Sequence, residues 1–200
     1  LEYLWNVNSV QLEEQSNRVI GNLTNTWQVT NDLKLRARVA TDFTSEKTEN
    51  RSPNTIPLAF GNSGSFSLAS YLNTIVYGDV MATYSKKITE EFTLGAVAGY
   101  TAQRETIQRL DRSTNSGLST ENMFDISASV NTPNSGSSRS ELVKDAFFGT
   151  LNLDYKGYLF VEGTVRRDRT STMNPNNNAF VYPSINASFL FSEAFTMPDF

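Results

Sequence analysis

The chain has 200 residues, a mean hydropathy of −0.37, and 17 basic against 21 acidic side chains. This mildly acidic balance gives no support for nucleic-acid binding, and the absence of cysteine and histidine excludes disulfides, thiolate metal sites and a histidine base. No stretch approaches the roughly 18 apolar residues of a membrane-spanning helix. We expect no bound metal ion and no cofactor.

Two segments near the start of the chain, 16–29 and 33–45, alternate between two kinds of residue with a period of two. Apolar residues such as Leu23 and Leu35 occupy one set of positions, and polar or charged residues such as Arg36 occupy the other. Because a β-strand has this period, each segment is expected to have one apolar and one polar face. The apolar face either packs in the core of a soluble sandwich or faces lipid in an outer-membrane barrel, whose polar face then lines the lumen.

Further alternating segments bring the number of predicted strands to seven. They are longer than the usual strand of about five or six residues and are long enough for the about 9–11 residues that cross a bilayer. This favours an all-β fold, an antiparallel up-and-down transmembrane β-barrel to which the chain contributes about seven strands. The predicted strands are 16–29, 33–45, 70–86, 92–104, 144–156, 158–169 and 181–191.

The connections between these strands are alternately short and long. Tight turns are predicted at 30–32, 88–91 and 156–157. Long polar connections rich in Asn, Ser, Thr and Gly are predicted at 46–69, 105–143 and 170–180. Short periplasmic turns and long extracellular loops are typical of membrane barrels, and a sandwich need not keep this order.

Aromatic residues on the apolar faces gather near both ends of the predicted strands, and small or aliphatic residues lie between them. Rings at the two membrane interfaces are typical of outer-membrane barrels, whereas the core of a sandwich would concentrate them in the middle of the strands. The predicted lipid-interface girdle comprises Trp27, Phe43, Tyr84, Phe92, Tyr100, Phe147, Tyr155 and Phe191.

Charged residues on the polar faces are the candidate lumen-facing side chains. They would either guide a polar substrate or hold a plug domain, or they would form ion pairs with neighbouring strands. These candidates are Arg18, Lys34, Arg36, Arg38, Asp42, Arg166 and Asp168.

Three arginines, Arg104, Arg167 and Arg169, fall on the apolar register near the predicted extracellular edge. We predict that they contact lipopolysaccharide phosphates, because a guanidinium binds phosphate oxygens in pairs. The alternative is that they are solvated charges at the rim or make contacts with loops. In the predicted loop 105–143, the apolar cluster 123–126 is expected to pack on a partner protein or to fold into the lumen.

The last quarter of the chain resembles a known family. Its residues 146–168 read AFFGTLNLDYKGYLFVEGTVRRD, followed by YPSINASF at 182–189 and SEAF at 192–195. This part of the chain resembles a hairpin of the SusC/RagA family of TonB-linked outer-membrane transporters of Bacteroidetes. The resemblance is most specific over residues 144–195. The segment LEYLWN at 1–6 is loosely similar to the NPYW segment of that family, with Leu-Glu in place of Asn-Pro, and Arg169 replaces the usual glycine.

The resemblance implies a 22-stranded barrel with an amino-terminal plug, energised through TonB, that imports oligosaccharides or peptides across the bacterial outer membrane beneath a SusD-like surface lipoprotein. Residues 1–200 show neither a plug nor a TonB box, so we expect the chain to be an internal part of one transmembrane barrel domain and TonB to bind elsewhere in the protein. We expect no enzymatic activity. The alternatives are a passive porin-like or structural barrel of the envelope and a secreted carbohydrate-binding β-sandwich.

Overall fold

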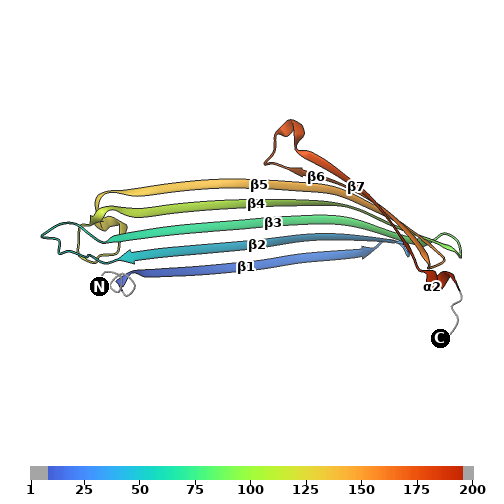
Figure 1. The fold of residues 1–200 in the computed structure, drawn as a ribbon, viewed down its shortest axis with the longest axis horizontal. Coiled ribbons are helices and arrows are strands. Elements are labelled where there is room, and N and C mark those ends of the chain that lie inside the picture. The colour runs from blue at the N-terminus through green and yellow to red at the C-terminus, as the bar shows by residue number, and fades with distance from the viewer. Residues whose placement is uncertain (1–8, 196–200) are drawn as a thin grey trace. The chain divides into compact units, whose positions relative to one another are not determined.

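Seven antiparallel strands form a single sheet in which every strand pairs with the next one in the chain (Figure 1). The structure is a computed structural model that describes residues 9–195. No helix in that range is long and apolar enough to cross a membrane. The strands are β1 (Gln11–Gln28), β2 (Leu33–Ser52), β3 (Ser65–Lys87), β4 (Phe92–Leu118), β5 (Ser129–Tyr155), β6 (Leu159–Thr170) and β7 (Ala179–Phe189). The short helical turns are η1 (Ile126–Ala128), η2 (Pro175–Asn177) and α2 (Phe191–Ala194).

The predicted all-β, up-and-down architecture and its seven strands are confirmed. The alternative of a β-sandwich is wrong, because the described strands form one sheet and not two stacked sheets. The segment 1–6, which carried part of the family resemblance, lies outside the described residues.

Of the predicted long connections, 46–69 is half strand and 105–143 is mostly strand. The segment expected as a loop over 46–69 shrinks to 53–64, and the one expected over 105–143 shrinks to 119–128. The prediction failed because Ser, Asn and Gly are poor strand formers by composition, yet here their backbone groups are satisfied by pairing with the neighbouring strand. The third connection is close to the prediction and runs from 171 to 178.

The chain divides into two compact units, and β1 to β5 contribute residues to both. The described part of unit 1 covers 9–20, 42–75 and 105–141, and that of unit 2 covers 21–41, 76–104 and 142–195.

Unit 1 contains a small apolar core. Leu118 is completely buried, and Phe66 and Ala128 are nearly so. Phe124 and Ile126 pack against them. Two residues of the apolar cluster 123–126, Phe124 and Ile126, therefore pack on the chain's own strands, whereas Met123 is exposed.

Two glycines in unit 1 adopt backbone conformations that other residues rarely reach. Gly64 has a φ of 76° and Gly117 a φ of 92°. A Cβ on either would lie 3.0 Å from backbone atoms of the facing segment. The backbone can therefore approach Gly64 and Gly117 this closely only because glycine has no side chain.

Unit 2 contains the β5–β6–β7 meander, whose register decides which side chains share a face. Phe148 pairs with Arg166, which in turn pairs with Tyr182 on β7. One residue along, Phe147 pairs with Arg167. Since successive residues of a strand point to opposite faces, the 148–166–182 row and the 147–167 row lie on opposite sides of the sheet.

Candidate functional site

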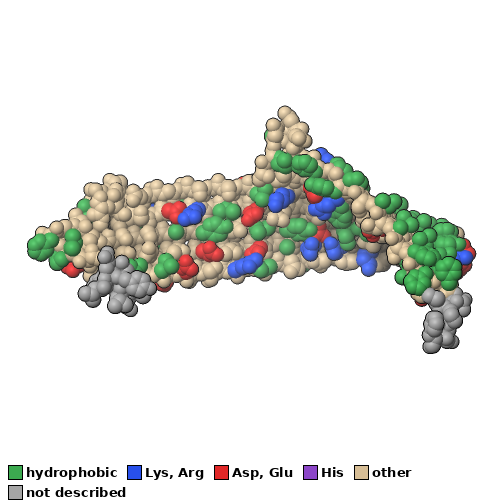
Figure 2. Space-filling view, in the orientation of Figure 1, with side chains coloured by type: hydrophobic (Ala, Val, Ile, Leu, Met, Phe, Trp, Pro, Cys, Tyr) green, Lys and Arg blue, Asp and Glu red, His purple; other side chains and the backbone are tan. Residues whose placement is uncertain are grey.

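The two faces of unit 2 differ in chemistry. We call the side that carries Arg36, Arg38, Asp79 and Arg166 the charged face, and the side that carries Tyr100 and Phe147 the apolar face. Acidic and basic side chains lie next to one another on the side of the sheet turned toward the viewer in Figure 2. A sheet with faces this different is expected to separate two different environments.

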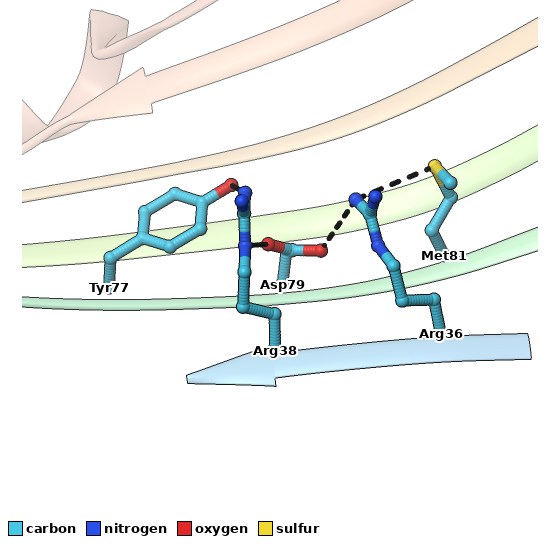
Figure 3. A network of polar contacts seen from close by, with 5 residues as sticks. All are labelled: Arg36, Arg38, Tyr77, Asp79 and Met81. Carbon is cyan, nitrogen blue, oxygen red and sulfur yellow. Dashed lines mark hydrogen bonds and ion pairs between the residues drawn. The ribbon is translucent and has the colours of Figure 1, made fainter. Parts of the chain in front are cut away.

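Asp79 on β3 is the centre of a cluster on the charged face (Figure 3). It is only 4% exposed and accepts hydrogen bonds from two arginines of β2. The Arg36 Nη2 lies 3.0 Å from Oδ1, and the Arg38 Nε lies 2.7 Å from Oδ2. Arg38 also lies over the ring of Tyr77, with 5.1 Å from its guanidinium carbon to the ring centre. We call these four residues the Asp79 cluster.

The Asp79 cluster has spare hydrogen-bond donors and a net positive charge. Two guanidiniums share one carboxylate, and both oxygens of that carboxylate are occupied. The Nε of Arg36 is buried and has no hydrogen-bond partner among the described residues. This atom is not accessible to a ligand, but the side chains of Arg36 and Arg38 are 36% and 40% exposed, so their excess positive charge favours a ligand that brings a carbonyl or carboxylate oxygen.

A pocket of about 470 Å³ lies on the charged face and includes Tyr77 of the Asp79 cluster. Arg166 in its lining is held by Asp168, with 2.8 Å from Nε to Oδ1, and lies 5.9 Å from the ring centre of Phe148. Rings beside charged and amide groups suit a polar ligand with some apolar surface. Other lining residues are Gln103, Lys144, Phe180 and Tyr182.

The remaining predicted lumen-facing residues are not among those that line this pocket. Arg18 and Asp42 form an exposed ion pair within unit 1, with 2.9 Å from Nε to Oδ1. Lys34 is exposed on β2 and forms no ion pair within residues 9–195. The structure thus brings together Arg36, Arg38, Arg166 and Asp168 through the residues around Tyr77.

Sequence reasoning missed Asp79 and Tyr77. Both sit at the polar positions of β3, alternating with Gly78 and Val80. The available signal was charge complementarity, because β3 offers one acid next to a strand that presents Lys34, Arg36 and Arg38 on one face. Using that signal requires the β2–β3 register, which alternation alone does not give.

Most predicted girdle residues lie on strands and several make ring contacts. The ring centres of Phe92 and Tyr155 are 4.6 Å apart, and those of Tyr100 and Phe147 are 4.5 Å apart. Trp27, Phe43 and Phe147 are exposed. Phe191 is an exception, because it begins the four-residue helix α2 and does not end a strand.

The three arginines predicted to bind phosphate have different surroundings. The Nε of Arg169 lies 2.8 Å from Oδ1 of Asp145, an acid that is itself buried. Arg104 is exposed on β4. Arg167 is exposed and forms no ion pair within residues 9–195.

No known protein family and no curated protein matches the sequence. Solved structures do match the fold. The chain superimposes on the RagAB peptide transporter with a TM-score of 0.88 at 18% identity, over 99% of this chain and 22% of that one. It matches the RagAB peptide importer in the open-open state with a TM-score of 0.86 at 17% identity, over 99% and 22% of the two chains.

A closed-closed state of the same importer gives a TM-score of 0.84 at 18% identity, over 93% of this chain and 21% of that one. The chain therefore spans about a fifth of the length of the structures it matches. At this identity the likeness shows the fold, which is that of a part of a transporter barrel.

Proposed function

We propose that the chain is part of a TonB-dependent, SusC-like transporter in the outer membrane that imports peptides or oligosaccharides. The observation that carries this proposal is the contrast between the apolar and charged faces of unit 2 on a sheet that has the fold of a transporter barrel. A polar ligand can move past the charged face while lipid covers the other.

The strand lengths of unit 2 support placing this unit in the membrane. Its parts of β1 to β5 are the segments 21–28, 33–41, 76–87, 92–104 and 142–155. Segments of this size approach or exceed the about 9–11 tilted residues that cross a bilayer. In this proposal the charged face lines the lumen and the tight turns lie on the periplasmic side.

The Asp79 cluster and the adjoining pocket support a polar substrate. The partly exposed guanidiniums of Arg36 and Arg38 and their net positive charge favour carbonyl and carboxylate oxygens, which peptides carry in every residue and at the chain end. The rings of Tyr77, Phe180 and Tyr182 suit either apolar peptide side chains or the faces of sugar rings. Peptides are favoured over oligosaccharides by the excess positive charge.

The proposed assembly includes partners that bind other parts of the protein. A surface lipoprotein would close over the barrel, by analogy with the open-open and closed-closed states named for the peptide importer. TonB would supply energy through a segment outside residues 1–200. Both partners follow from the family resemblance of 144–195.

Uptake by cells tests the proposal. A strain lacking the protein is complemented with the wild type, with the double variant Arg36→Gln/Arg38→Gln, or with the control Arg139→Gln, an exposed unit 1 arginine without an ion pair among the described residues. Labelled peptides and labelled oligosaccharides are supplied in parallel. Peptide uptake is expected to fall about tenfold in the double variant and to be unchanged in the control.

A protonophore separates energised import from a passive barrel. Collapse of the proton gradient should stop uptake by the wild type. Uptake that continues at the same rate would support the porin-like alternative, and an equal uptake with and without the protein would refute transport of these substrates.

A further inference from the structure

The apolar face of unit 2 contains a groove of about 660 Å³. Small residues on four neighbouring strands, Ala37, Ala82, Ala98 and Gly149, line it. Larger groups line it as well, Trp27 on β1 and the tilted rings of Tyr100 and Phe147 on β4 and β5. Because small side chains next to large ones leave a depression on a sheet, the hollow follows directly from the sequence of this face.

The groove has one feature that bare lipid contact does not require. Arg167 lies at its β6 edge, where the register places it opposite Phe147 on β5 and Val181 on β7. A cation between apolar neighbours is costly in a membrane unless an anion reaches it.

The other arginines of the same strand have acids from the chain itself. Arg166 pairs with Asp168 and Arg169 pairs with Asp145, whereas Arg167 has no ion-pair partner among residues 9–195. The chain therefore neutralises the cations on either side of Arg167 and leaves this one exposed beside the groove.

We infer that the groove is a specific binding site for lipopolysaccharide, with acyl chains of its lipid A along the small residues and a phosphate on Arg167. The inference rests on the proposed outer-membrane location. Arg167 lies toward the end of β6 that leads into the 171–178 connection, which is the extracellular end in that proposal. Lipopolysaccharide is the phosphorylated amphiphile of the leaflet on that side, and a groove lined by six strands suits its several acyl chains better than a two-chain lipid.

Of the three arginines predicted to contact lipopolysaccharide phosphates, Arg167 alone is assigned to this site. Arg169 already binds a buried carboxylate, so a phosphate there would compete with Asp145. Arg104 is not among the residues that line the groove.

Native mass spectrometry of the full protein, extracted from outer membranes in mild detergent, tests the site. The wild type should retain lipid A. Arg167→Gln removes the phosphate partner and Ala98→Phe fills the groove, and each should lower the retained lipid A about tenfold. Arg167→Lys should keep part of the binding, and Arg139→Gln, which removes an exposed cation of unit 1, should change nothing.

Added competitors separate the lipid from its headgroup. Purified lipid A added back to delipidated protein should rebind to the wild type, whereas inorganic phosphate alone should not displace it. The inference is overturned if Arg167→Gln and Ala98→Phe retain as much lipid A as the wild type, if phosphatidylethanolamine is retained in its place, or if phosphate alone displaces it.

The inference and the proposed function fail in distinguishable ways. Protein that imports peptide but retains no lipid A contradicts the inference alone. Protein that is absent from the outer membrane contradicts the proposed function and, with it, the premise of the lipid site. A variant that does not insert is replaced by Arg167→Lys and by lipid A titration of the wild type, which keep the test decisive.

Discussion

Unit 1 and unit 2 share five strands of one sheet but are stabilised by different interactions. In unit 1 an apolar core around Leu118 holds the ends of β3 and β4 together with the turn η1. In the described part of unit 2 the least exposed charged group is Asp79, held by two arginines of the neighbouring strand, while many large apolar residues remain exposed. The difference teaches that strands of one sheet can be stabilised beyond their backbone hydrogen bonds in two ways, by a buried apolar core in unit 1 and by ion pairs on the charged face in unit 2.

The largest effect is expected from opening the core of unit 1. Leu118→Ala removes a completely buried side chain and should destabilise unit 1 by about 3 kcal/mol through lost burial and the cavity left behind. Hydrogen exchange measured by mass spectrometry should show much faster exchange in 112–118 and 128–134 and unchanged exchange in 92–104.

The matched control is Leu110→Ala on the same strand, where the side chain is 55% exposed and the change should cost less than about 0.5 kcal/mol. Equal acceleration of exchange in both units would show that the two are one cooperative unit and would break the comparison.

The next largest effect is expected on the charged face of unit 2. Asp79→Asn leaves two guanidiniums facing a neutral amide, and the half-exposed state of both arginines limits the cost to about 2 kcal/mol. Denaturant unfolding of the protein in detergent measures it. A second change, Arg38→Gln, should recover part of the loss because it removes one of the two unbalanced charges.

Asp111→Asn is the control for Asp79→Asn. Asp111 pairs with Arg109 at the surface of unit 1, where both side chains are well exposed, and its replacement should cost at most about 0.5 kcal/mol. If the two replacements cost the same, burial of Asp79 is not what makes the cluster strong.

A smaller effect is expected at Gly99 on β4, where the ring of Phe148 packs against the backbone. A Cβ on Gly99 would clash with the ring of Phe148, so Gly99→Ala must displace this ring, which lies beside Arg166, and should cost about 1 kcal/mol. Phe148→Leu in the same chain should relieve the clash. Gly163→Ala on β6 is the control, because nothing lies within 4 Å of its Cβ position, and thermal unfolding should not change.

The smallest effect is a pH dependence confined to unit 1. Hydrogen bonds from Lys47 and Arg51 lower the pKa of the Glu49 carboxyl below its ordinary 4.5. A carboxyl with a lowered pKa stabilises the fold above its unfolded pKa, and this contribution is lost as the pH falls through its folded pKa. Exchange near 47–51 should therefore rise only below about pH 4.5, and Glu49→Gln should abolish that rise. A rise near neutral pH would contradict this assignment.

The difference between unit 1 and unit 2 also explains which strands the sequence predicted correctly and which it did not. The predicted strands 92–104 and 144–156 nearly coincide with the unit 2 parts of β4 and β5, because an apolar face imposes a visible period on the sequence. The strand extensions of unit 1 were predicted as loops, because polar residues on both faces leave no such period. Segments such as 129–140 pair through their backbone, and their own composition does not indicate which strand they pair with.

The candidate site was predictable only in part. Arg36, Arg38, Arg166 and Asp168 stand out as charges at the polar positions of alternating strands. Asp79 and Asp145 become informative only when the register puts each beside an arginine of the next strand. Such pairs are long-range properties of the sheet.

The polar extensions of β4 and β5 have a consequence for how this protein can vary in length. Two paired strands of a hairpin can both gain or lose the same even number of residues. The side chains in the rest of the two strands then stay on their original faces, because a strand has a period of two. Insertions and deletions in 105–141 that obey this parity should therefore be tolerated among related sequences, whereas single-residue insertions in 92–104 would exchange the residues on the apolar face and the charged face of that strand.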